Sequence, residues 1–124
     1  MDFSRKTLGG QRTRYYESDT ESSLQLVFLP GVYCPEMWKH QVKYFSESFR
    51  TITYRPDRRD YDSQMKMMED ILEQDGVDNV VLVSQGLGNR LARELEYREE
   101  VVATILTGAR TRGPRIPRQL FSLS

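Results

Sequence analysis

The chain has 124 residues, which suits a single domain, and its 18 Lys and Arg residues balance its 18 Asp and Glu residues. Without net charge it has no overall field to draw it to nucleic acid or to an anionic membrane, so we expect neither partner. Its single cysteine excludes an internal disulfide, no stretch approaches the roughly 20 apolar residues that span a bilayer, and the polar start lacks a secretory signal, which together predict a cytoplasmic protein.

The N-terminal third predicts a hairpin followed by an inner strand. Residues 4–8 and 11–16 flank the turn signal Gly9-Gly10, and the second segment has strand propensity. Residues 24–29 are almost continuously apolar, as strands are when both faces of their sheet are covered. This strand is expected to end at Pro30-Gly31.

Helices and strands then alternate. Pro35 is suited to the first turn of a helix over residues 35–47, since the apolar side chains that follow it recur about four apart. Residues 50–54 are rich in β-branched side chains and predict a second inner strand, and the charged segment 57–62 predicts a loop. The pattern continues with a helix that ends near Gly76 and a third strand over residues 79–83. It ends with a helix carrying Leu87, Leu91 and Leu95 and a last strand over residues 101–106.

This alternation predicts an α/β fold, a three-layer sandwich with a mostly parallel sheet and the hairpin as an antiparallel extension at one edge. The predicted domain covers residues 1–108. Residues 109–124 carry four arginines and no acid up to position 118, and they predict a basic C-terminal tail.

Three parts of the chain carry the most specific motifs: Phe28-Leu29-Pro30-Gly31 with Glu36-Met37-Trp38, the segment 80–89, and the segment 101–108. Together these motifs resemble the N-terminal half of the α/β-hydrolase fold. The resemblance covers about residues 11–108 and implies a truncated α/β-hydrolase fold.

In that family a G-x-S-x-G turn between a strand and a helix exposes the nucleophile. Here the turn reads Ser84-Gln85-Gly86-Leu87-Gly88, so Ser84 and Gly88 match its small positions and Gly86 stands where the nucleophile would be. Glycine has no side chain with which to attack a substrate. The resemblance also implies oxyanion-hole-like backbone N–H groups at Val32 and Leu87, while the family places its acid and histidine later than this sequence extends.

These residues allow several other functional interpretations. The turn at Gly86 is either a remnant site for an anion or carbonyl, made by the N–H groups at a helix start, or a tight turn that needs small residues. Ser84 as a displaced nucleophile, Cys34 as a reactive thiol and His40 as a catalytic base are each disfavoured by position. A nucleotide site at the glycines lacks the third small residue and the acid of that fingerprint, so no cofactor is predicted. The carboxylates of residues 57–62 could suggest a cation site, but Arg58 and Arg59 neutralise much of that charge, so no metal is predicted.

The last predicted strand, residues 101–106 from Val101 to Leu106, would have unpaired backbone groups along one side. Such an edge is a template for another chain. These backbone groups would be paired by self-association, by a partner chain carrying the second half, or by the tail with Ile116, Leu120 and Phe121. We favour a homo-oligomer.

The sequence thus predicts a non-catalytic binding or assembly module. The alternative is an ester or acyl hydrolase completed in trans by a chain that supplies nucleophile, acid and histidine.

Overall fold

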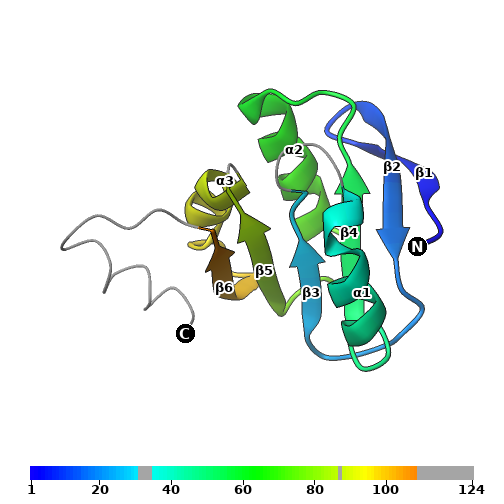
Figure 1. The fold of residues 1–124 in the computed structure, drawn as a ribbon. Helices are drawn as coiled ribbons and strands as arrows, with labels where there is room; N and C mark the ends of the chain where they lie inside the picture. Colours follow the sequence, from blue (N-terminus) through cyan, green and yellow to red (C-terminus); the bar gives the residue numbers. More distant parts are fainter. Residues whose placement is uncertain (31–34, 87, 109–124) are drawn as a thin grey trace.

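The computed structural model describes residues 1–30, 35–86 and 88–108. Within them a six-stranded sheet has the order β1-β2-β4-β3-β5-β6 (Figure 1). Four strands run parallel: β3 (Gln25–Phe28), β4 (Arg50–Arg55), β5 (Val80–Gln85) and β6 (Val101–Thr107). The hairpin of β1 (Ser4–Leu8) and β2 (Gln11–Glu17) is antiparallel and pairs with β4 through β2. The predicted fold class, a mostly parallel α/β sheet extended by a hairpin, is confirmed.

Alternate residues of the inner strands face opposite layers, which is why these strands are apolar throughout. Leu26 and Phe28 pack on the side that holds the 3-10 turn η1 (Pro35–Trp38) and helix α1 (Lys39–Phe45). Val27, between them, packs on the side that holds α2 (Tyr61–Leu72) and α3 (Gly88–Leu95). In Figure 1, α1 lies in front of the sheet, and α2 and α3 lie behind it.

Most of the buried apolar side chains belong to the layer formed by α2 and α3. Helix α2 contributes four fully or nearly fully buried side chains there, each worth about 1.5–3 kcal/mol in burial: Met67, Met68, Ile71 and Leu72. No helix in the described parts of the chain is long and apolar enough to cross a membrane.

The predicted helix over residues 35–47 differs from the observed structure in its first turn. Residues Pro35–Trp38 form a 3-10 turn, and the α-helix begins only at Lys39. The indole Nε1 of Trp38 donates to the carbonyl oxygen of Leu29 at 2.6 Å, and its ring packs against Phe28 with centroids 5.2 Å apart. This hydrogen bond holds the tighter turn against the end of β3.

Helix α2 begins earlier than expected, within the segment 57–62 that the sequence indicates as a loop. Asp60 is its N-cap: the carboxylate accepts a hydrogen bond from the backbone N–H of Ser63 at 3.0 Å. Hydrogen bonds from Ser63 hold the pKa of Asp60 below its usual value. An acidic N-cap satisfies a free backbone donor, so the charges here mark a helix start rather than an extended loop.

Candidate functional site

The candidate site is the turn between β5 and α3, at the carboxyl end of the parallel strands. Ligands of open α/β sheets bind at this end. Gly86 follows β5 with φ of +58°, a left-handed conformation that favours glycine. Its carbonyl accepts from the backbone N–H of Asn89 at 3.0 Å, which joins the turn to the first residues of α3. The backbone therefore bends sharply between β5 and α3, at the position where the sequence motif predicts a nucleophile turn.

The described residues do not crowd Gly86. A Cβ atom added to Gly86 would meet no described atom within 4 Å. Its left-handed backbone conformation is what disfavours a side chain at this position. What the turn lacks is a reactive group.

Ser84 points away from the turn, as its position in β5 predicts. Its side chain is fully buried, and Oγ donates to Oδ1 of Asn89 at 2.5 Å. Asn89 Nδ2 in turn donates to the carbonyl of Thr107 at 3.1 Å, and Thr107 Oγ1 donates to the carbonyl of Ser84 at 2.8 Å. This closed set of hydrogen bonds joins β5, α3 and β6. Asn89 and Thr107 were not singled out from the sequence, because their role depends on a contact between segments about 20 residues apart.

Gly88 and Gln85 lie near the apex of the turn, and Gly88 has a packing role. A Cβ atom at Gly88 would lie 3.6 Å from the Cβ atoms of Leu29 and Ser84, which is ordinary contact. The small residue at this position thus allows α3 to approach β3 and β5 closely, with room for one methyl group. Gln85 is exposed at the end of β5, and its Cγ would lie 3.4 Å from a Cβ atom added to Gly108.

Of the remaining candidate residues, the described structure places only His40. Val32 and Leu87, the predicted oxyanion-hole-like donors, lie outside the described residues, as does Cys34. His40 is exposed on α1, across the sheet from α3. Among the residues with assigned positions, no group of three His, Cys, Asp or Glu side chains could hold a metal ion.

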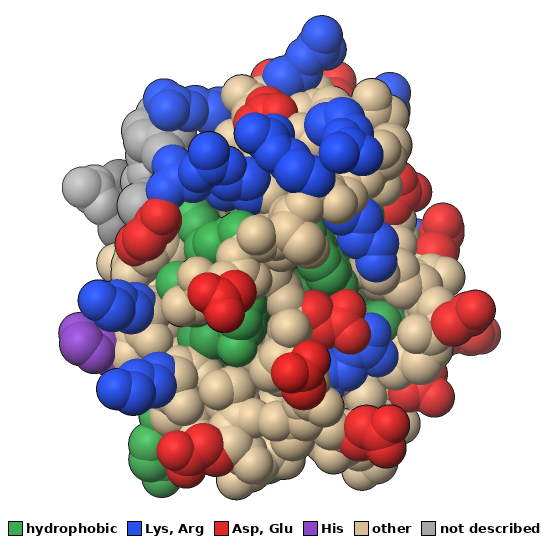
Figure 2. Space-filling view, turned by 90° about the vertical axis from the view of Figure 1, so that its right-hand side faces the viewer, with side chains coloured by type: hydrophobic (Ala, Val, Ile, Leu, Met, Phe, Trp, Pro, Cys, Tyr) green, Lys and Arg blue, Asp and Glu red, His purple; other side chains and the backbone are tan. Residues whose placement is uncertain are grey.

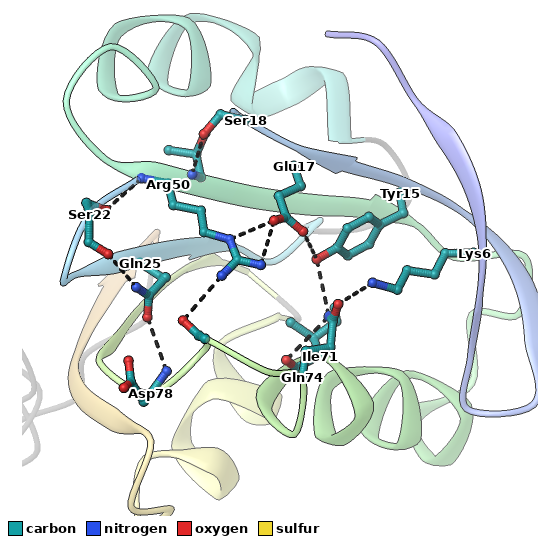
Figure 3. A network of polar contacts seen from close by, with 12 residues as sticks. Lys6, Tyr15, Glu17, Ser18, Ser22, Gln25, Arg50, Ile71, Gln74 and Asp78 are labelled. Carbon is teal, nitrogen blue, oxygen red and sulfur yellow. Dashed lines mark hydrogen bonds and ion pairs between the residues drawn. The ribbon is translucent and has the colours of Figure 1, made fainter. Parts of the chain in front are cut away.

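A second polar cluster lies at the opposite end of the sheet, where the parallel strands begin (Figure 3). Arg50 binds Glu17 through Nε at 2.7 Å and donates from Nη1 to the carbonyl of Gly76 at 3.2 Å. The hydroxyl of Tyr15 donates to Glu17 at 3.0 Å and accepts from Gln74 at 3.2 Å. Burial raises the pKa of Tyr15 above its usual value. Because these groups bind one another, the cluster joins β2 and β4 to the segment that follows α2 and is structural.

Comparisons with known proteins agree with this geometry. No protein-family model and no curated protein matches the chain. Among solved structures, an AqdC variant in complex with its substrate, described for ring cleavage of the Pseudomonas quinolone signal, has a TM-score of 0.76 at 19% identity. The match covers 93% of this chain and 49% of that one.

Two further structures show the same likeness. One is from a study of epoxide hydrolases of the α/β-hydrolase superfamily from metagenomes of hot environments (TM-score 0.73, 19% identity, 85% of this chain and 41% of that one). The other is a bromoperoxidase from Bacillus anthracis (TM-score 0.66, 20% identity, 85% of this chain and 44% of that one). The chain thus spans less than half the length of each of these structures, and over that part it has the α/β-hydrolase fold.

Proposed function

We propose that this chain is a non-catalytic α/β-hydrolase-like protein that acts as a binding or assembly module. The observation that carries the proposal is Gly86, which follows β5 in a left-handed turn, at the position that the motif gives to the nucleophile, and has no side chain. The Ser84 hydroxyl is engaged beneath the turn, and the single histidine of the chain, His40, is exposed on α1. Acyl transfer needs a nucleophile and a base within hydrogen-bond reach of each other.

The chemical capacity of such a turn lies in its backbone. We place the oxyanion-hole-like donors at the N–H groups of Val32 and Leu87, following the family pattern. Donors of this kind stabilise a carbonyl or a small anion whatever side chains surround them. They give a binding role to a turn that has no nucleophile.

The assembly role rests on a difference between the two edges of the sheet. The edge strand β1 carries Arg5 and Lys6, and charged residues of this kind discourage pairing with another chain. The edge strand β6 has no charged residue, and its Val102 and Ile105 side chains are 51% and 37% exposed. No strand of the described structure pairs with the outer side of β6. We place the partner along β6 and take that partner to be a second copy of this chain.

The catalytic part of the proposal is tested with short-chain aryl esters and a serine-reactive fluorophosphonate, with a known serine esterase as positive control. The purified chain is expected to give neither turnover nor labelling. Turnover or labelling that disappears in Ser84→Ala or in Cys34→Ala would identify a nucleophile and overturn the proposal. Activity that survives both substitutions would overturn it as well.

A second candidate is an ester or acyl hydrolase completed in trans. The surroundings of Gly86 favour it, because no described atom lies within 4 Å of a Cβ atom added there, so the described residues leave room for a nucleophile from another chain. The chain is purified together with whatever chain binds it and treated with the fluorophosphonate. Labelling of the partner, with turnover that requires both chains, would support this candidate over a purely non-catalytic role.

A further inference from the structure

Arginines form a row across three neighbouring strands. Arg5 of β1 lies directly opposite Arg14 of β2, and Arg14 lies directly opposite Arg55 of β4. Opposed residues of antiparallel strands point to the same face of the sheet, with Cβ atoms about 4.5–5.5 Å apart. Arg12 lies two residues before Arg14 on β2 and so shares that face. We call these four residues the arginine row.

The arginine row lies on the open side of the hairpin. Thr13 and Tyr15, which alternate with these arginines on β2, are buried on the side of α2. The row therefore faces the other side of the sheet, where α1 lies in front of β4 and leaves β1 and β2 uncovered in Figure 1. Figure 2 shows Lys and Arg side chains gathered across the upper part of the molecule on its hairpin side.

Three members of the row have no opposite charge to compensate them. Arg5, Arg12 and Arg14 are exposed, and none forms an ion pair with a described residue. Arg55 alone pairs with a carboxylate, that of Glu36. Like charges directly opposite each other destabilise a sheet. The free chain thus accepts repulsion that an anionic partner would relieve.

We propose that the arginine row is a docking surface for an acidic peptide segment of a partner protein. All four cations are arginines, whose planar guanidinium groups bind carboxylates through two parallel hydrogen bonds. Alternate side chains of an extended peptide lie about 6.6–6.8 Å apart, within reach of neighbouring guanidinium groups on flexible side chains. An extended segment with acids at alternate positions therefore fits the row.

Two observations favour a peptide over a single-stranded nucleic acid. The whole chain has no net charge, whereas nucleic-acid-binding domains are commonly strongly basic. Stacking of bases needs free aromatic faces. Beside the row, the hairpin carries Phe3 and Tyr16 on this face, and these two side chains pack against each other with ring centroids 6.2 Å apart.

Fluorescence anisotropy tests the proposal with a fluorescein-labelled peptide of about twelve residues that has glutamate at alternate positions. The chain should bind this peptide, with an affinity that falls as NaCl is added. Arg5→Gln/Arg14→Gln should weaken binding at least about tenfold, because it removes two charge-assisted contacts. The control Lys39→Gln/Lys43→Gln removes the same charge from exposed positions on α1 and should change binding less than about twofold. Thermal melting checks that each variant is folded.

Three results would overturn the proposal. The first is no binding of the peptide to the unaltered chain at low salt. The second is an equal loss in the arginine variant and the lysine control, which would indicate nonspecific charge attraction. The third is tighter binding of a single-stranded oligothymidylate of matched length than of the peptide, which would assign the row to nucleic acid instead.

Discussion

The hydroxyl of Ser84 donates to the side-chain oxygen of Asn89 at 2.5 Å, beneath the turn at Gly86. This contact joins the end of β5 to the first turn of α3 and occupies the one hydroxyl within the motif. The serine of the motif therefore supports the turn from below and is not exposed at its apex. The contact determines the first prediction.

Ser84→Ala should lower the free energy of unfolding by about 1–3 kcal/mol. The substitution leaves Oδ1 of the buried Asn89 without its donor, and an unsatisfied buried polar group carries a desolvation penalty of this size. Urea denaturation measures the change. Ser48→Ala is a suitable control, because that residue is exposed and hydrogen-bonds to Phe45 through its backbone N–H, so the substitution should cost less in stability than Ser84→Ala. A loss below about 0.5 kcal/mol for Ser84→Ala would show that the contact contributes little.

Gly86→Ser should lower the free energy of unfolding by about 1–2 kcal/mol without creating esterase activity. The penalty arises because a residue with a Cβ atom is strained at φ of +58°, although the added atom has space. Activity should stay absent because a serine hydroxyl needs a base to activate it. Gly10→Ser, with φ of +79° and open space in the hairpin turn, is the matched control and should lose similar stability. Ester turnover by Gly86→Ser alone would contradict the prediction, because it would require a base close to residue 86.

The fold was largely predictable from the sequence because its inner strands are buried on both faces. Continuous apolar runs such as residues 24–29 can occur at strand length only where helices cover the sheet from both sides. The boundaries of the helices were harder to predict from the sequence. The 3-10 turn at Pro35–Trp38 depends on the hydrogen bond from Trp38 to Leu29, and periodicity alone does not separate it from an α-helical turn.

The site was predictable only in part. Gly86 and its position after an inner strand follow from the motif, and so does the orientation of Ser84. The contacts of Asn89 and Thr107 require knowledge of how β6 aligns with β5, which no local pattern contains. The arginine row likewise appears only when the register of β1, β2 and β4 is known, since Arg55 is about 40 residues from its partner Arg14 and the pairing of Arg5 with Arg14 depends on the hairpin register.

The cluster around Arg50 predicts a contrast between two ion pairs. Glu17→Gln should lower the free energy of unfolding by about 1–2 kcal/mol, because the partly buried Arg50 loses its carboxylate partner. Glu36→Gln removes a more exposed partner, that of Arg55, and should cost at most about 0.5 kcal/mol. Urea denaturation at two salt concentrations measures both variants. Equal losses would show that burial does not strengthen the Glu17–Arg50 pair.

The N-cap of α2 predicts a pH dependence. The folded-state pKa of Asp60 is lowered by Ser63, so the contribution of its carboxylate to stability is full above the usual pKa of about 3.9 and is lost as pH falls through the lowered value. Asp60→Ala should therefore be less stable than the unaltered chain at pH 7, and the difference should shrink below about pH 4.

Asp60→Asn is the control for this prediction, because asparagine caps helices as well as aspartate does and does not titrate. Its advantage over Asp60→Ala should stay constant with pH. Urea midpoints between pH 7 and pH 3 give both differences. A gap between the unaltered chain and Asp60→Ala that widens toward acid pH would contradict the assigned cap.

Light scattering coupled to size-exclusion chromatography tests the assembly role most directly. The unaltered chain should elute with twice the monomer mass, and Val102→Lys/Ile105→Lys should elute as a monomer, because charges on an edge strand oppose pairing. Tyr97→Lys alters a residue that is 80% exposed outside β6 and should remain a dimer. An unaltered chain that stays monomeric at all concentrations, or a dimer that survives both lysines in β6, would contradict assembly through this edge.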